Sequence, residues 1–389
     1  MHPGIRHLCL LIMVVPFCGG CASPKLKQER VFYPDGKEKV NKEETIESLV
    51  PNGKEMSILP DEWMEYRNNA TAPGDVDGYF VKEKEISAPQ PVTIRWTNKN
   101  ETSKYTFILS DNDAMKNSKS FETDKTYFDI EDLYANTQYF YQIKAEYDNY
   151  YVLSKRFDFK TVDYFRTINI AGVKNARDLG NKKASNGKKR VKQGLVYRMA
   201  ELDGATTQGK RDAVQKYGIK TDLDLRAKGP TESPLGPSIN YINNGEGKYG
   251  SPHYVSQFYG VNVDFYQGPM RDNLKVFTDK NNYPIAFHCS VGRDRTGTLA
   301  VTLLLILGVD LYQIREDFAV SFFSNACNYY SFSDYEGSLE NLFKYYKHFK
   351  GDDGKDTGNI YKRVEKYCYH IGLSKNDISA IRENLLERA

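Results

Sequence analysis

The stretch Tyr283–Gly308 decides the fold, and it reads YPIAFHCSVGRDRTGTLAVTLLLILG. Its apolar run over 285–287 is long enough for a buried strand, and 298–307 is apolar on nearly all sides, as in a helix buried in a core. Gly308 is typical of the residue that ends a helix. A strand, a tight loop and a helix N-terminus together form an anion site, because unpaired backbone N–H groups point at the ligand and the helix dipole favours negative charge.

The loop between strand and helix carries side chains suited to nucleophilic attack on a phosphate ester. Cys289 lies where the helix dipole and the Arg295 guanidinium both stabilise a thiolate. Arg295 can bind two phosphate oxygens at once, which a lysine cannot. We expect the Thr296 hydroxyl to hydrogen-bond the sulfur when it leaves, and His288 to fix the loop without acting on substrate. The residues expected to bind the phosphate are Ser290, Val291, Gly292, Arg293, Asp294 and Arg295.

A structural role for Cys289 is the alternative, since a buried cysteine is usually a small hydrophobe. Cys-x5-Arg alone arises often by chance. The full string His-Cys-x-x-Gly-x-Asp-Arg-Thr-Gly between a strand and a helix is far more demanding. It therefore favours a catalytic cysteine.

The loop resembles the HCxxGKDRTG signature of a bacterial branch of the cysteine-dependent tyrosine phosphatases, which act on phosphoproteins and phosphoinositides. Further motifs of that branch have counterparts in the same order, over roughly residues 165–389: NARDLG at 175–180, GLVYR at 194–198, GIKTDLDLR at 218–226 and GLS at 372–374. The resemblance implies an α/β domain with a central, mostly parallel sheet flanked by helices. Two positions depart from the family pattern. Arg293 replaces a lysine, and Asn181 replaces a glycine but also tolerates left-handed backbone.

The mechanism implied by the resemblance is attack of the Cys289 thiolate on phosphorus, with a cysteinyl-phosphate intermediate and no metal or cofactor. The general acid is open, because the chain has no Trp-Pro-Asp sequence. We rank Asp294 first and Asp224 second, with Asp178 as a third possibility. Asp224 and Asp178 could equally form internal ion pairs with neighbouring arginines.

The expected substrate is a phosphotyrosine protein. A phosphoinositide is the alternative, because Arg293, Arg295 and His288 together offer extra positive charge. A catalytically silent phosphate-binding adaptor is the alternative from another class, and the intact Cys289, Arg295 and Thr296 argue against it. Sulfur transfer fits less well, since the Asp-Arg-Thr-Gly continuation suits phosphate.

The N-terminus predicts export. Arg6 precedes an apolar run from Leu8 to Phe17 that is too short to span a bilayer, and Gly19-Gly20-Cys21 resembles a bacterial lipoprotein cleavage site. We therefore predict a signal peptide over 1–20, lipidation of Cys21 and anchoring in the bacterial cell envelope. An ordinary signal peptide cut near Ala22 is the alternative.

Residues 22–60 are polar with many Lys and Glu, and we expect a tether over 21–75. Within it, Trp63, Met64 and Tyr66 indicate a short ordered lead-in over about 61–75. From 76 to 162 apolar residues alternate with polar ones, as at Val92, Ile94 and Trp96, which predicts a β-sandwich. Leu133-x-Ala135-x-Thr137-x-Tyr139 resembles a corner of fibronectin type III domains. This all-β domain precedes the phosphatase-like domain at 163–389, and its candidate role is a spacer or a docking site for a protein or glycan.

Composition excludes some functions. A net charge of +3 over 389 residues is too small to argue for nucleic acid. Beyond the signal and Cys21, only Cys289, Cys327 and Cys368 remain, without the spacing of a metal site or a disulfide framework. The Tyr-rich stretch 325–359 is either a lid over the active site or a surface helix pair.

Overall fold

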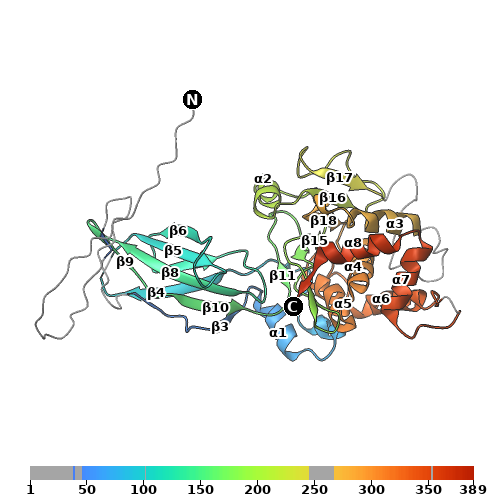
Figure 1. The fold of residues 1–389 in the computed structure, drawn as a ribbon, viewed down its shortest axis with the longest axis horizontal. Coiled ribbons are helices and arrows are strands. Elements are labelled where there is room, and N and C mark those ends of the chain that lie inside the picture. Colours follow the sequence, from blue (N-terminus) through green and yellow to red (C-terminus); the bar gives the residue numbers. More distant parts are fainter. Residues whose placement is uncertain (1–37, 40–45, 101, 245–266, 352–353) are drawn as a thin grey trace, which may run out of the picture.

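The computed structural model describes residues 38–39, 46–100, 102–244, 267–351 and 354–389. Figure 1 shows two lobes side by side along the long axis, a β-sandwich and an α/β domain, with helix α1 at their junction. Cys21 and the predicted signal peptide lie outside the described residues.

The sandwich consists of two facing sheets. The larger sheet contains β1 (Glu38–Lys39), β3 (Lys54–Met56), β5 (Tyr105–Ser110), β6 (Lys119–Thr123), β8 (Gln138–Glu146), β9 (Tyr150–Leu153) and β10 (Phe157–Thr161), and the smaller one contains β2 (Ile46–Ser48), β4 (Val92–Asn98) and β7 (Tyr127–Ile130). Strands β4, β5 and β8 bury alternate residues, as their sequence pattern predicts. Trp96 of one sheet stacks on Phe107 of the other, with ring centroids 6.2 Å apart. The Tyr139 hydroxyl accepts a hydrogen bond from the Tyr134 N–H at 2.8 Å, which fixes the corner before β8.

The predicted tether differs from the structure over residues 46–75. This part of the chain forms β2, β3 and helix α1 (Asp61–Asn69) and begins a short 3-10 helix, η1 (Pro73–Gly78). Its polar composition conceals a few widely spaced residues that are almost fully buried: Ile46, Ile58, Leu59, Trp63 and Tyr66. The sequence between β3 and β4 therefore leaves the sandwich, crosses the α/β domain and returns. We call residues 57–91 the insertion segment.

Trp63 is the main anchor of the insertion segment. Its ring stacks on Phe323 with centroids 4.7 Å apart and meets Phe165 edge-on, and its Nε1 donates to the Ile86 carbonyl at 2.7 Å. We expect Trp63→Ala to lower the free energy of unfolding by about 3–5 kcal/mol, because it leaves a large cavity. Urea denaturation followed by circular dichroism measures the change. Glu65→Ala, exposed on the same helix, is the control, and an equal loss in both variants would refute the anchoring role.

The α/β domain is built on a six-stranded sheet of order β11-β12-β15-β18-β16-β17. Strands β15, β18, β16 and β17 are parallel, whereas β11 and β12 are antiparallel at one edge. Their bounds are Arg166–Thr167 (β11), Arg177–Asp178 (β12), Val196–Met199 (β15), Ile285–His288 (β18), Thr221–Asp224 (β16) and Asn240–Asn243 (β17). The prediction of a mostly parallel sheet is confirmed.

Helices flank this sheet (Figure 1). They are α2 (Thr207–Arg211), continued by η2 (Asp212–Lys216), then α3 (Gln267–Val276), α4 (Asp294–Leu307), α5 (Leu311–Ala319), α6 (Ser333–Tyr346), α7 (Ile360–His370) and α8 (Lys375–Leu385), with short 3-10 turns η5 (Lys280–Asn282) and η6 (Val320–Phe323). A small sheet of β13 (Lys183–Ala184), β14 (Lys189–Val191) and β19 (Leu386–Arg388) ties the C-terminus to the domain.

Helix α4 is the centre of the domain. Every residue from Arg295 to Leu307 is buried, and α3, α5, α7 and α8 all contact it. Gly308 ends the helix with a φ of +75°, as predicted. A helix apolar on all sides can be stable in water only when other elements surround it, which explains this position.

Among its described residues the stretch 325–359 contains helix α6, and α7 begins just beyond it at Ile360. Leu342 and Tyr346 on α6 are buried, and the Tyr346 hydroxyl lies 2.7 Å from the Thr302 hydroxyl on α4. Helix α6 also contacts α7. It is therefore packed into the domain rather than placed as a separate lid.

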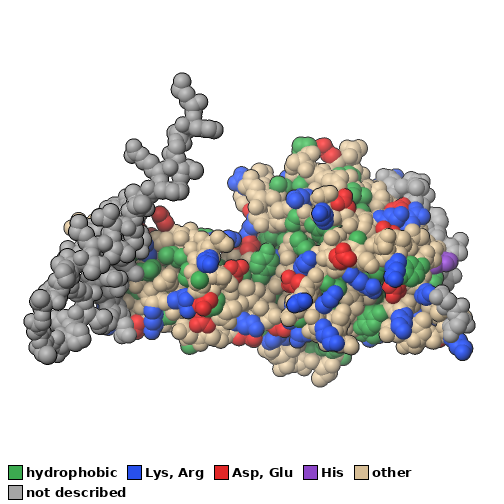
Figure 2. Space-filling view, viewed as in Figure 1, with side chains coloured by type: hydrophobic (Ala, Val, Ile, Leu, Met, Phe, Trp, Pro, Cys, Tyr) green, Lys and Arg blue, Asp and Glu red, His purple; other side chains and the backbone are tan. Residues whose placement is uncertain are grey.

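The two lobes share specific polar contacts. The Gln193 amide exchanges two hydrogen bonds of 2.9 Å with the backbone of Ala135, and the Tyr217 hydroxyl donates to Asp132 at 2.6 Å. Side chains of both charges are spread over the face seen in Figure 2. Among the described residues no helix is both long and apolar enough to cross a membrane.

Candidate active site

The loop 289–293 joins the end of β18 to the start of α4. Strands β15 and β16 lie on either side of β18, so the carboxyl ends of three parallel strands meet at this point. Cys289 is 1% exposed. Gly292 has a φ of +72°, and a Cβ there would lie 2.4 Å from the Met199 carbonyl oxygen, so only glycine fits without strain.

Three carbonyl groups of the loop are held by residues outside it. The Ser290 carbonyl accepts from the Glu201 N–H at 3.1 Å, Val291 from Asn175 Nδ2 at 3.0 Å, and Gly292 from Arg198 Nη2 at 2.8 Å. Among the described residues, none accepts a hydrogen bond from the N–H groups of Ser290, Val291 or Gly292. A loop with occupied carbonyls and unpaired N–H groups is a cradle for an anion.

Arg295 supplies a cation without a strong partner. Its side chain is largely buried, yet its Nε has no hydrogen-bond partner among the described residues. Its two other nitrogens make only long contacts of 3.4 Å, to the Leu225 carbonyl and the Ser290 hydroxyl. Because a buried, unsatisfied guanidinium is costly, this arrangement favours a bound oxyanion.

Asp317 on α5 organises the support behind the loop. Its carboxylate pairs with Arg177, Lys182 and Arg198, all almost fully buried. Burial opposes ionisation, but the three cations hold the pKa of Asp317 far below its usual range. Arg198 in turn holds the Gly292 carbonyl, and Arg177 donates to Asn175 Oδ1 at 2.6 Å. Asp317 thus fixes two of the groups that orient the loop.

Sequence reasoning missed both Asp317 and the loop-supporting roles of Asn175 and Arg198. Asn175 and Arg198 do belong to the motifs NARDLG and GLVYR, which carried the resemblance without a physical role. Asp317 lies in no motif, so no local signal marks it.

His288 ends strand β18 next to the loop, and its Nδ1 lies 3.3 Å from the Cys289 carbonyl oxygen. Its Nε2 lies 2.9 Å from Asp222 Oδ1, and both side chains are fully buried. Burial lowers the pKa of His288, but the hydrogen bond and charge of Asp222 outweigh it, so the pKa is raised above 6.5. The imidazolium therefore persists to higher pH in the folded protein than in the unfolded chain.

This raised pKa predicts a pH-dependent stability. The contribution of the charged His288 is fully present below the unfolded value of about 6.5 and is lost as pH rises through the folded value. We expect the loss of unfolding free energy in His288→Gln to be largest in the acidic range and to shrink with rising pH. Urea denaturation of both proteins across this range tests it, with His370→Gln at an exposed position as control. A loss that grows with pH would contradict the assignment.

Asp224 and Asp178 are in internal ion pairs. Asp224 is completely buried and accepts several hydrogen bonds from Arg226, and burial is outweighed by Arg226 and His288, so the pKa of Asp224 is lowered. Asp178 accepts from Arg166 and from the Gly180 and Gly194 N–H groups. A general acid must carry a proton, so the prediction of Asp224 as a candidate is not supported by this geometry.

Asp294 remains at the site. It is the first residue of α4, its side chain is 19% exposed, and its carboxylate pairs with Arg293 at 3.0 Å. The Arg293 guanidinium also lies 5.7 Å from the centre of the Phe322 ring and 5.9 Å from that of Tyr330. Of the three candidate acids, Asp294 is the one that directly follows the phosphate loop, at the start of α4.

Two further side chains adjoin the loop. The Thr296 hydroxyl is buried and has no hydrogen-bond partner among the described residues, so it is available to a neighbouring sulfur or phosphate. Burial raises the pKa of the Cys327 thiol to about 12, and the thiol donates to the Val291 carbonyl at 3.3 Å. The predicted loop residues Cys289 to Thr296 are therefore together at one site.

The described residues contain no group of three or more His, Cys, Asp or Glu arranged to hold a metal.

A family model described as tyrosine phosphatase family matches residues 168–387. This range covers more than half of the chain and contains the whole loop. The chain belongs to the tyrosine phosphatase family.

The individual relatives of this chain have low sequence identity to it. A Cupriavidus necator protein that carries the name of a tyrosine-protein phosphatase is 27% identical over 155 residues, or 35% of this chain and 56% of the relative. A tyrosine-protein phosphatase of Nostoc commune is 27% identical over 139 residues, or 32% of this chain and 47% of the relative. The chain thus spans about half the length of these curated relatives.

One solved structure with partial similarity is TpbA of P. aeruginosa in complex with phosphotyrosine. It is 14% identical, with a TM-score of 0.29, and the match covers 48% of this chain and 91% of TpbA. Because the TM-score is low, this similarity carries no weight in the assignment.

Proposed function

We propose that this chain is a protein-tyrosine phosphatase that works through a cysteinyl-phosphate intermediate. The single observation that carries the proposal is the cradle itself. Cys289 lies at the base of a loop whose Ser290, Val291 and Gly292 N–H groups have no acceptor among the described residues, beside an Arg295 guanidinium that lacks a strong partner. Membership of the tyrosine phosphatase family supports it.

The first step is in-line attack of the Cys289 thiolate on phosphorus, which forms the S–P bond as the P–O bond to the leaving group breaks. Arg295 and the loop N–H groups bind the equatorial oxygens, where negative charge is greatest. Water then attacks the cysteinyl phosphate and releases inorganic phosphate. The Thr296 hydroxyl, which has no other partner among the described residues, would donate to the departing sulfur.

Asp294 is the proposed general acid for the first step and general base for the second. In that role the Asp294 carboxyl group would carry a proton when the ester binds. The leaving oxygen would take that proton, and the attacking water would return one. An Asp294→Asn variant should therefore lose far more activity on an ester with a poor leaving group than on p-nitrophenyl phosphate. Equal losses on both esters would exclude Asp294 as the acid.

Phosphotyrosine is the proposed substrate class. Tyr329 and Tyr330 follow the segment that adjoins the loop, are more than half exposed, and Tyr330 lies beside Arg293. Aromatic side chains next to the phosphate site would pack on the ring of an aryl phosphate and give the site depth. A phosphoinositide is the second candidate, because Arg293 places a further guanidinium next to the loop.

Export, lipidation of Cys21 and envelope localisation remain proposals that rest on the N-terminal sequence. The likeness of the sandwich to fibronectin type III domains, and its use to dock a protein or glycan, are likewise proposed. The corner made by Tyr139 supports the likeness.

The test is phosphate release by the full chain without added metal, from a phosphotyrosine peptide, a phosphoserine peptide and a soluble phosphoinositide in parallel. We expect the phosphotyrosine peptide to give a kcat/KM at least about 10-fold above the other two substrates. Faster release from the phosphoinositide would contradict phosphotyrosine as the substrate class and favour phosphoinositides. No release from any of them by the folded, reduced protein would favour the silent adaptor.

A further inference from the structure

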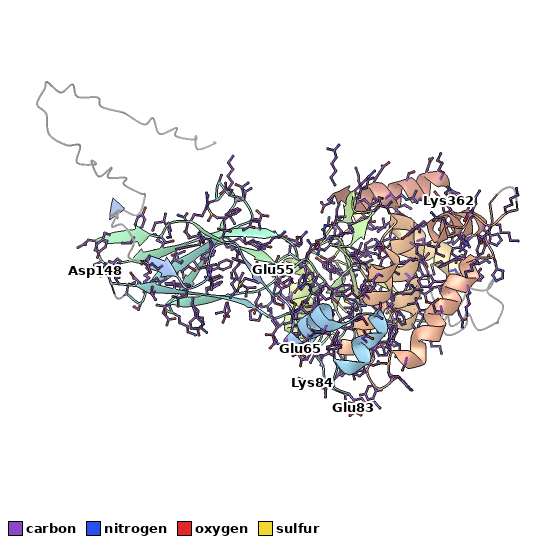
Figure 3. All side chains as sticks on the ribbon, turned by 90° about the horizontal axis from the view of Figure 1, so that it is seen from below. Glu55, Glu65, Glu83, Lys84, Asp148 and Lys362 are labelled. Carbon is purple, nitrogen blue, oxygen red and sulfur yellow. The ribbon has the colours of Figure 1, made fainter. Side chains whose placement is uncertain are left out.

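The insertion segment contacts residues that support the catalytic loop. Its second part, residues 81–88, lies against residues 323–328, which follow α5 and precede α6. In Figure 3 the helices of the insertion segment lie against the helices of the α/β domain, with Glu83 and Lys84 labelled at the outer surface. The matched family region begins only at residue 168, so this segment lies outside it.

Asn328 clamps the segment to the domain. Its Nδ2 donates to the carbonyls of Val81 and Lys84 at 3.1 and 2.9 Å, and its Oδ1 accepts from the Glu83 N–H at 2.8 Å. The Asn328 side chain is fully buried, and the three bonds that it makes to the exposed residues 81–84 are partly buried. The Ile86 N–H adds a backbone bond of 3.0 Å to the Phe323 carbonyl.

Glu85 and Ser87 make the bonds nearest the loop. Glu85 Oε2 accepts from the Ser324 hydroxyl at 2.8 Å and from the Asn325 N–H at 3.1 Å. The Ser87 hydroxyl accepts from the Asn175 N–H at 3.2 Å and also donates to Glu85. The segment thus holds residues 323–328 with one side chain and the backbone of Asn175 with the other.

Both supported groups converge on one carbonyl of the phosphate loop. Asn175 Nδ2 donates to the Val291 carbonyl at 3.0 Å, and Cys327 Sγ donates to the same oxygen at 3.3 Å. Asn175 Nδ2 is also 3.5 Å from Cys327 Sγ. Because a peptide group is planar and trans, a Val291 carbonyl held outward turns the Gly292 N–H inward, toward a bound phosphate.

We propose that the insertion segment is part of the catalytic unit, with Glu85 and Ser87 as positioning residues that hold the Val291–Gly292 peptide through Asn175 and residues 323–328. This inference rests on the proposed phosphatase function for its activity readout, but not for its binding readout. It assigns a role in catalysis to residues that precede the sandwich strand β4, far from the loop in sequence.

The test compares the full chain with Ser87→Ala and with Glu85→Gln/Ser87→Ala. Lys82→Ala, exposed on the same segment, is the matched control. For the double variant we expect kcat/KM for p-nitrophenyl phosphate to fall by about 10-fold, since a displaced oxyanion donor loses much of its effect. The inhibition constant for vanadate should rise by about the same factor, while the control stays near the wild type. Thermal unfolding by circular dichroism reports whether each variant is folded.

A merely structural role would lower the unfolding temperature without changing the vanadate constant of the folded protein, and that result would overturn the proposal. The single Ser87→Ala variant removes only one oxygen atom, and it replaces the double variant in the test if the double variant fails to fold. Its inhibition constant for vanadate should also rise.

Thermal stabilisation by inorganic phosphate needs no turnover and separates the two claims. If the wild type binds phosphate without hydrolysing esters, and the variants bind it more weakly, the proposed function fails and the positioning role stands. If the wild type hydrolyses esters and the variants match it in rate and phosphate binding, the positioning role fails alone.

Discussion

Replacing Cys289 by serine is expected to lower phosphate release from p-nitrophenyl phosphate by about 10,000-fold or more. A serine hydroxyl is not ionised at neutral pH and is a far weaker nucleophile than a thiolate, so the covalent step is lost. The geometry of the anion cradle should persist, because the Ser290, Val291 and Gly292 carbonyls are held by other residues. Steady-state kinetics on the purified full chain measure the rate.

Two controls make this result specific. Cys368→Ser replaces a buried cysteine on α7 and should leave the rate per folded molecule within a few-fold of the wild type. The Cys289→Ser protein should still be stabilised by inorganic phosphate. Substantial residual turnover in that protein would show that Cys289 is not the nucleophile.

Asp317→Asn is expected to be the most destabilising conservative substitution in the domain. The amide has the shape of the carboxylate but leaves Arg177, Arg198 and Lys182 buried without their counter-charge. Breaking a buried ion pair from one side costs about 3–5 kcal/mol, and this carboxylate serves three cations. We expect the free energy of unfolding to fall by at least that range, as measured by urea denaturation.

The same substitution should affect catalysis in whatever fraction remains folded. Asp317 fixes the Arg198 side chain, which donates to the Gly292 carbonyl. Without this ion pair the Gly292 peptide is held less firmly, so the affinity of the protein for vanadate should fall. Glu383→Gln removes an exposed carboxylate from α8 and is the control for charge alone. An Asp317→Asn protein as stable as this control would show that the three cations do not depend on Asp317.

The catalytic loop could be predicted from the sequence because its information is local. A strand of apolar residues, a glycine at a left-handed position and an apolar helix ending at Gly308 all lie within Tyr283–Gly308. The alternating burial of β4 and β8 follows from a period of two in the same way. The mostly parallel sheet came from the family resemblance, and the structure has it.

The support of the loop could not be predicted, because its contacts join residues far apart in the chain. Asp317 meets Arg177 across 140 positions, and Asn328 meets Glu83 across 245. Neither Asp317 nor Asn328 lies in a sequence motif that marks its role. The polar composition before residue 76 predicts a tether, although Trp63 and Tyr66 are buried and anchor this part of the insertion segment. The rest of the segment, 76–91, falls in the predicted sandwich but lies outside its strands. For Asp224 the sequence predicts two roles, because spacing alone cannot distinguish a general acid from an ion-pair partner of Arg226.

The most direct test of the central claim is to trap the phosphorylated enzyme. The full chain is mixed with p-nitrophenyl phosphate, quenched in acid within its first turnovers, digested and examined by mass spectrometry. The account predicts the mass of one added phosphoryl group on the peptide that contains Cys289, and its absence in Cys289→Ser. Turnover by the wild type with phosphate on another residue, or with no phosphoenzyme under any quench time, would contradict a cysteinyl-phosphate mechanism.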